Sequence, residues 1–286
     1  MKRDFFLKPL ICLLVASCSV HEFDPLDTRT TNQCVFHAYL ESTFEPETKV
    51  YINEDINIRW DANDRISLFN EVTLNQQYVF KGQTGDNAGE FEKVSAPFGT
   101  GNDLDYICAV YPYMSSTKIS NADVMILKFP AVQIYKEGSF GPGANTMVSV
   151  TKEDPLMFKN AGGYLVLKFY GTDISISSIM LEGRNGEPLS GEATWKVSVG
   201  GTPDFVFAST AGTSITLTCD NPVILGTDKE TATVFWMVVP PTPFENGFKL
   251  TITGADGKVF TKETDKNLYI IRNTLLRIAP IEVKFD

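Results

Sequence analysis

The sequence predicts an all-β protein, and three of its features support this prediction. Short runs rich in Val, Ile, Phe, Tyr and Thr alternate with clusters of Gly, Asn, Asp and Pro. A helical period of 3.6 residues is never kept over a dozen residues. Many short strands separated by turns are typical of sandwiches and barrels. The 286 residues are enough for two domains of ordinary size.

The expected strands form two groups, separated by a polar break at Lys152–Pro155. Each expected strand is an apolar or alternating run that ends at turn-forming residues. The first group comprises Cys34–Glu41, Asp64–Phe69, Gln77–Gly82, Glu90–Val94, Asp105–Val110, Val124–Phe129 and Thr146–Val150. The second comprises Leu156–Lys159, Tyr164–Tyr170, Ile176–Glu182, Gly191–Val197, Asp204–Ala208, Ser214–Cys219, Thr233–Val239, Phe248–Thr253 and Lys258–Glu263. The break predicts an N-terminal β-sandwich over residues 34–154 and a C-terminal β-sandwich over residues 155–286.

Two turns carry a hairpin signal. Asp256-Gly257 and Asn185-Gly186 each lie between apolar runs. Hairpin turns of this type need positive φ angles, which Gly and Asn tolerate. The sequence therefore predicts tight reversals at both places.

The N-terminus carries an apolar run, Leu10–Val20, after a basic head. The run is too short to span a bilayer, which needs about 20 apolar residues, and it predicts an export signal over residues 1–17. Val15-Ala16-Ser17-Cys18 resembles the lipobox of bacterial lipoproteins. The resemblance implies cleavage between Ser17 and Cys18 and a lipid on Cys18 that anchors the chain in the outer membrane. The polar residues 18–33 then form a tether; the alternative is a plain signal peptide with a chance cysteine.

Charge and cysteine content exclude several classes of protein. The net charge is −10, and an acidic chain is a poor ligand for nucleic acid. The acidic residues are spread along the chain, and their expected role is to keep the protein soluble. Cys34, Cys108 and Cys219 each lie in a β-like apolar run, so we expect buried free thiols. Their spacing predicts neither a disulfide framework nor a metal site.

Candidate catalytic residues are few. The chain has two histidines, His21 in the tether and His37 in the first expected strand. It has neither a G-x-S-x-G nor an H-E-x-x-H motif. We therefore expect no catalytic residues, no metal and no cofactor, and a non-enzymatic protein. A hydrolase that uses loop carboxylates such as Asp103 and Asp105 is the alternative, and it would need acids that converge in a cleft.

Two loop motifs resemble ligand-binding loops only in part. Asp61–Glu71 looks like a calcium loop, but Arg65 and Ile66 replace an oxygen ligand and the required glycine. Gly82–Glu90 is glycine-rich but lacks the G-K-[ST] of a phosphate-binding loop. Aromatic residues at Tyr111–Met114 and Thr242–Phe244 lie near strand ends; we expect core or turn packing there, with sugar-binding platforms as the alternative.

Several segments together resemble one protein family. The segment "RWDANDRISLFN" is similar to an early strand with the pattern W-x-x-G-D-x-I-x-x-F, with Asn63 where glycine is usual. Further similar segments follow in order: "FPAVQIYKEGSFGPGANTMVSV", "LMFKNAGGYLVLKFYG", "VFWMVVPPTPFENGFKLTITGADGK" and "IIRNTLLRIAPIEV". From Asn57 to Asp286 the chain thus resembles the fimbrillin family of lipoprotein-derived pilins.

This resemblance implies two transthyretin-like β-sandwich domains in tandem and a structural or anchoring subunit of a surface pilus that mediates adhesion. It implies that a trypsin-like protease removes the first strand and that the C-terminal strands of another pilin subunit fill the gap. Mapped onto this chain, the processing site is Lys49, less plausibly Arg29, and the donor is Ile270–Phe285. Lys49 could equally be an ordinary loop lysine, and the protein would then stay lipidated as an anchor.

The second functional hypothesis is a surface lipoprotein that is not polymerised. It would bind host or bacterial surface glycans or proteins through Tyr111 and Tyr113. Both hypotheses place the protein at the cell surface, on the outer membrane or in a fimbrium.

Overall fold

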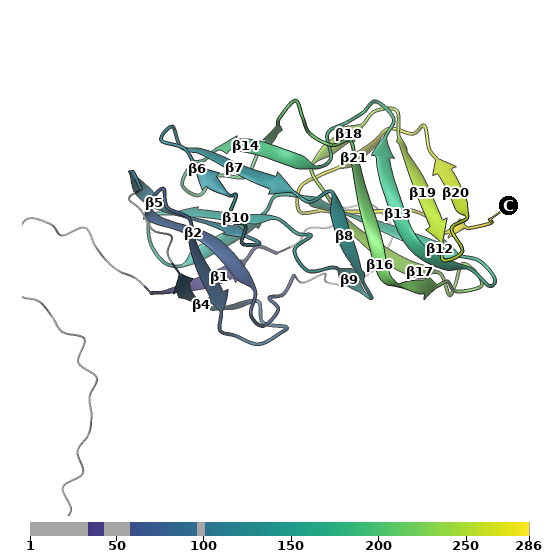
Figure 1. Cartoon of the computed structure of the whole chain (residues 1–286), viewed down its shortest axis with the longest axis horizontal. Helices are drawn as coiled ribbons and strands as arrows, with labels where there is room; N and C mark the ends of the chain where they lie inside the picture. Colours follow the sequence, from purple (N-terminus) through teal and green to yellow (C-terminus); the bar gives the residue numbers. More distant parts are fainter. Residues whose placement is uncertain (1–33, 43–57, 96–100, 286) are drawn as a thin grey trace, which may run out of the picture. The chain divides into compact units, whose positions relative to one another are not determined.

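The computed structural model of the chain describes residues 34–42, 58–95 and 101–285, whose regular structure is all strand (Figure 1). The predicted all-β class is confirmed for these residues. No helix among them is long and apolar enough to cross a membrane. The strands up to the predicted boundary are β1 (Val35–Leu40), β2 (Arg65–Val72), β3 (Gln76–Phe80), β4 (Ala88–Ser95), β5 (Asp103–Tyr111), β6 (Lys118–Ile119), β7 (Val124–Phe129), β8 (Val132–Lys136), β9 (Ser139–Phe140) and β10 (Met147–Thr151).

The remaining strands follow the predicted boundary. They are β11 (Leu156–Asn160), β12 (Gly163–Tyr170), β13 (Ser175–Gly183), β14 (Gly191–Lys196), β15 (Val206–Phe207), β16 (Ser214–Ile224), β17 (Thr233–Val239), β18 (Thr242–Phe244), β19 (Phe248–Gly254), β20 (Val259–Glu263), β21 (Leu268–Ile270), β22 (Leu275–Arg277) and β23 (Ile281–Glu282).

Strand pairing builds one barrel and several open sheets. The barrel is closed and has the order β1-β11-β10-β5-β2-β3-β4. A six-stranded sheet has the order β20-β19-β13-β16-β8-β9, and a smaller sheet has β12 between β17 and the C-terminal strands β22 and β23. Strands β15-β14-β7-β6 form a further sheet, and β18 pairs with β21.

Three apolar cores hold these sheets together. The first fills the barrel with residues such as Trp60 and Phe91 and extends to Tyr164 and Val166 of β12. The second packs the six-stranded sheet against β12 and β17. The third lies between the barrel and the sheet of β7 and β14. Strand β5 contributes Ile107 and Ala109 to the first core but Cys108 to the third. A strand buried on both faces reads as a continuous apolar run, which explains the segment "YICAVY".

Strand pairing crosses the predicted division at residue 154. Strand β11 lies in the barrel, paired with β1 and β10 of the first half. Strand β8 pairs with β16, and β7 pairs with β14. The domain boundary stays a prediction. Strands from before and after residue 154 lie together in the same sheets.

The two predicted reversals differ in outcome. Gly257 has a φ of +82° and joins β19 to β20 as a hairpin, as predicted. Gly186 also has positive φ, +68°, but β13 before it and β14 after it belong to different sheets, so the predicted hairpin there is wrong. Asn63 has a φ of +68°. Glycine adopts this backbone conformation readily, and asparagine adopts it more often than most other residues. This agrees with the glycine that the similar strand pattern has at this position.

The cysteines agree only partly with expectation. Cys108 is a buried free thiol, and burial raises its pKa above the ordinary range. Cys219 is half-buried, and burial raises its pKa to about 11. Cys34 is exposed, so the prediction of burial is wrong for it. It directly precedes β1, and its carbonyl accepts a hydrogen bond from the Lys93 N–H of β4 at 2.9 Å.

Candidate functional site

Strand β1 closes the barrel. It pairs antiparallel with β4, with Phe36 opposite Phe91, and parallel with β11, with Leu40 opposite Phe158. Without β1 the same sheet would be open, with β4 and β11 as its edges. We call the place of β1 between β4 and β11 the β1 slot.

The side chains of β1 alternate between the core and the surface. Phe36 and Ala38 are fully buried, and Leu40 packs against the same core. The Phe36 ring meets the Tyr78 ring edge-on, with centroids 5.7 Å apart. Tyr39, on the other face, is 44% exposed. Burial of a Phe side chain stabilises a fold by about 1.5–3 kcal/mol. The inward-facing side chains of β1 therefore contribute to the stability of the barrel core.

His37 ties the outer face of β1 to β4 and to the loop between β10 and β11. Its backbone N–H donates to Asp154 Oδ1 at 2.8 Å, and its ring Nδ1 lies 2.6 Å from Asp154 Oδ2. Nε2 lies 3.5 Å from Glu90 Oε1 on β4. The hydrogen bond with Asp154, and then the charge of Asp154, raise the pKa of His37 above its ordinary value of 6.5. The sequence predicts His37 on a strand but carries no signal for these partners.

The raised pKa predicts that β1 is held more firmly at low pH. Stabilisation by His37 is complete below its unfolded pKa of 6.5 and is lost as the pH rises through the higher folded pKa. We expect the melting temperature of the wild type to exceed that of a His37→Gln variant most at pH 5.5, with the difference vanishing by pH 9. An Asp154→Asn variant should show the same loss of pH dependence. Parallel curves for the wild type and His37→Gln across this range would contradict the assignment.

The predicted donor segment, Ile270–Phe285, is docked in its own sheet. β22 and β23 both pair parallel with β12. Ile270 and Val283 are 4% and 1% exposed and belong to the second core. The segment must therefore leave this sheet before it could enter another subunit.

The predicted lipidation and processing residues lie outside the described residues. These are Ser17, Cys18, Arg29 and Lys49. The described chain ends at Ser42 after β1 and resumes at Ile58, so the position of Lys49 relative to the β1 slot is not described.

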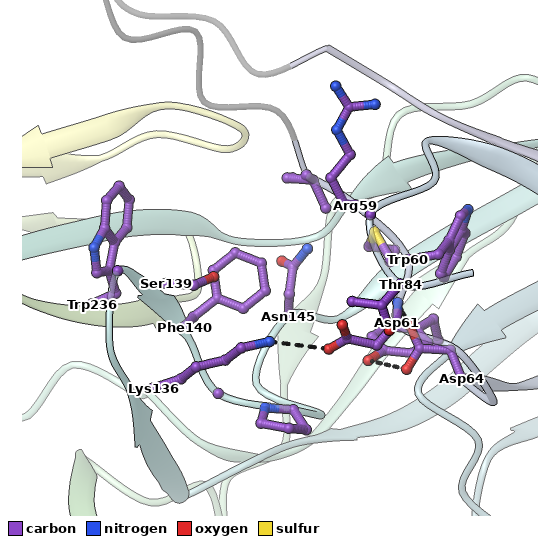
Figure 2. Close-up of a pocket in the computed structure, with 17 residues that line it drawn as sticks. Arg59, Trp60, Asp61, Asp64, Thr84, Lys136, Ser139, Phe140, Asn145 and Trp236 are labelled. Atoms are coloured by element: carbon purple, nitrogen blue, oxygen red, sulfur yellow. Dashed lines mark hydrogen bonds and ion pairs between the residues drawn. The ribbon is translucent and has the colours of Figure 1, made fainter. Parts of the chain in front are cut away.

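A cavity of about 440 Å³ opens beside the barrel, with Trp60, Tyr111, Phe140 and Trp236 in its wall (Figure 2). Lys136 Nζ lies 3.1 Å from Asp61 Oδ2. This ion pair links the β8–β9 hairpin to the loop before β2.

The polar groups of this cavity stabilise the turn before β2. Tyr111 donates to Asp64 Oδ1 at 3.0 Å, and the Asp61 backbone N–H donates to Asp64 Oδ2 at 2.9 Å. Burial raises the pKa of Asp64. These contacts hold the turn at Asp61 and Asp64, at the start of the segment that looks like a calcium loop.

The aromatic residues proposed as sugar platforms are mostly in the core. Tyr111 is 9% exposed and Phe244 is fully buried, which confirms the expectation of core packing at these two positions. Tyr113 is half-buried. The alternative prediction of a flat, exposed platform formed by Tyr111 and Tyr113 is therefore wrong, because Tyr111 faces inward and donates a hydrogen bond to Asp64.

No protein-family model and no curated protein sequence matches the chain. Among solved structures, it is similar to a candidate cell adhesion protein from Bacteroides uniformis, with 15% identity, a TM-score of 0.46, and 89% of this chain and 94% of that chain covered. A candidate cell adhesion protein from Bacteroides ovatus gives 14% identity and a TM-score of 0.45, with 82% and 87% covered. The tip fimbrial protein Mfa3 from Porphyromonas gingivalis gives 9% and 0.29, with 85% and 94% covered. These three proteins are thus two candidate cell adhesion proteins and one fimbrial protein.

Proposed function

We propose that the chain is a structural or anchoring subunit of a surface pilus that acts in adhesion. It is exported as a lipoprotein, anchored in the outer membrane through Cys18, and assembled with other pilin subunits by strand exchange. The proposal includes the tandem transthyretin-like arrangement implied by the resemblance. One observation carries it: β1 is the strand that closes the barrel, and it lies at the start of the described chain.

The physics of sheet edges supports this role. Loss of β1 would expose the unpaired N–H and C=O groups of β4 and β11 along an apolar channel. Such edges bind an added strand, with main-chain hydrogen bonds for affinity and side-chain pockets for specificity. Cleavage after Lys49 would remove β1, whereas cleavage after Arg29 would free the lipid and keep β1.

The C-terminal sequence has the alternation that the β1 slot requires. Ile281, Val283 and Phe285 alternate with the charged Glu282 and Lys284. The period of two puts the three apolar side chains on one face of an extended strand, as in β1 itself. A second copy of the chain therefore carries a segment suited to the slot.

Intact mass and N-terminal sequence of the protein, taken from its native cell surface, test the proposal. A species that begins at Val50 and lacks acyl chains supports processing and a polymerising subunit. A species that begins at acylated Cys18 supports an anchoring subunit that keeps β1. A chain that is neither acylated at Cys18 nor cut between Cys18 and Val50 would overturn the proposed export and assembly.

A further inference from the structure

The end of β1 meets the segment that precedes β22. Glu41 and Ser42 follow β1, whereas Arg272 and Asn273 precede β22, more than two hundred residues later. Both pairs contact Asn160, the last residue of β11. Asn160 thus bonds both to the residue that follows β1 and to the residues that precede β22.

A charged contact forms the outer part of this junction. Arg272 Nη1 lies 2.5 Å from Glu41 Oε1 and also donates to the Asn160 carbonyl at 3.0 Å. The backbone N–H of Asn160 donates to the same Glu41 oxygen. The two charged side chains are only 22% and 19% exposed, so water screens this pair less than an ordinary surface pair.

A line of buried amides forms the inner part. Asn145 Nδ2 donates to Asn160 Oδ1, and Asn160 Nδ2 donates to Asn273 Oδ1, each at 2.7 Å. Asn273 Nδ2 then donates to the Ser42 carbonyl, also at 2.7 Å. Each of the three asparagines is 1% exposed. A buried amide network of this kind stabilises a structure only while every member keeps its partner.

Loss of residues 34–42 would break the network at two points. Arg272 and the Asn160 N–H would lose the Glu41 carboxylate, and Asn273 Nδ2 would lose the Ser42 carbonyl. Groups left buried without partners are costly, and departure of the segment from the sheet would let water satisfy them.

We propose that this junction is a latch through which β1 holds the C-terminal segment in its own sheet. Removal of β1 opens a slot in the barrel and, through the latch, releases Ile270–Phe285 from β18 and β12. The biological meaning of the latch rests on the proposed function: a subunit could donate its C-terminal segment only after it has lost its own first strand. An unprocessed chain would then be unable to donate its C-terminal segment before its own β1 slot is open to accept a strand.

Hydrogen exchange in the full, unprocessed chain tests the latch directly. We expect a Glu41→Ala variant to exchange backbone amides in residues 270–283 at least tenfold faster than the wild type. The paired strands β7 and β14, whose buried side chains belong to the third core, should be unchanged in the same sample, which excludes general unfolding. Glu90→Gln is the matched control, because this carboxylate contacts β1 through His37 but not the C-terminal segment; it should leave residues 270–283 protected.

Two further variants keep the test decisive if Glu41→Ala folds poorly. We expect Arg272→Ala to speed exchange in residues 270–283 in the same way, because it removes the other partner of the contact. Glu41→Gln keeps an amide oxygen that can accept from Arg272 and from the Asn160 N–H, and it should stay within twofold of the wild type. Unchanged exchange in both Glu41→Ala and Arg272→Ala would overturn the latch. Neither readout requires polymerisation. A chain that shows the latch but never oligomerises argues against the pilus proposal alone, and oligomers without an effect of Glu41 argue against the latch alone.

Discussion

A variant that lacks residues 34–42 is expected to form head-to-tail oligomers through the vacated β1 slot. The deletion removes two fully buried side chains, Phe36 and Ala38, and leaves the backbone edges of β4 and β11 unpaired. Closed barrels have no edges, whereas an open sheet with an apolar channel is a ready template for another strand. Since the C-terminal segment of a second copy alternates apolar and polar residues, it can fill the channel. Light scattering after gel filtration should show a ladder of masses that grows with concentration.

A peptide of residues 34–42, added in trans, is the control for this experiment. It should occupy the slot, restore the monomer and, if the truncated chain folds poorly, restore its far-ultraviolet circular dichroism. A peptide carrying Phe36→Asp and Ala38→Asp should do neither, because both positions face the core. A truncated chain that stays strictly monomeric without the peptide, at high concentration and with native dichroism, would contradict strand exchange.

The slot could be predicted from the sequence only in outline. The alternation in "VFHAYL" identifies a strand with one buried face, and β1 has the predicted pattern. Its neighbours could not be predicted, because pairing between distant strands leaves no periodic signal in a single sequence. Strand β11 begins beyond the predicted domain boundary and still pairs with β1. The break at Lys152–Pro155 is thus a turn between two barrel strands, β10 and β11.

The residues that fix β1 at its two ends were missed for a related reason. His37 and Asp154 are 117 positions apart, and Glu41 and Arg272 are 231 apart. Isolated charges in loops are usually solvated, so composition gives no reason to pair them. The strands β21, β22 and β23 were also not resolved as separate elements, because runs of two or three residues are too short to show a period.

Replacement of Trp60 by alanine is expected to cost about 3–5 kcal/mol of unfolding free energy, as is typical when a buried aromatic residue is lost. The indole is 1% exposed. Its ring centroid lies 5.0 Å from that of Phe91, 5.3 Å from that of Phe158 and 5.5 Å from that of Tyr111. Domains are stable by only about 5–15 kcal/mol, so the variant should lie near its unfolding transition at moderate urea concentrations. Urea unfolding followed by circular dichroism measures the change.

Trp60→Phe is the matched variant and should cost roughly half as much, because it keeps an aromatic ring in the same space. The buried Nε1 of Trp60 has no hydrogen-bond partner among the described residues, so the substitution removes volume but leaves no polar group unpaired. Trp236→Ala should cost less than Trp60→Ala, because Trp236 is half-buried. A cost below about 1 kcal/mol for Trp60→Ala would mean that the barrel core does not depend on this ring.

The same substitution also bears on the β1 slot. Phe91 lies on β4 opposite Phe36, and Phe158 lies on β11 opposite Leu40, so Trp60 packs against both walls of the slot. We therefore expect Trp60→Ala to speed amide exchange in β1 more than in the hairpin of β19 and β20, which belongs to another core. Equal acceleration in both places would indicate global unfolding. A selective effect on β1 would mean that two interactions hold the first strand in the barrel. These are the packing of the aromatic side chains around Trp60 and the main-chain hydrogen bonds to β4 and β11.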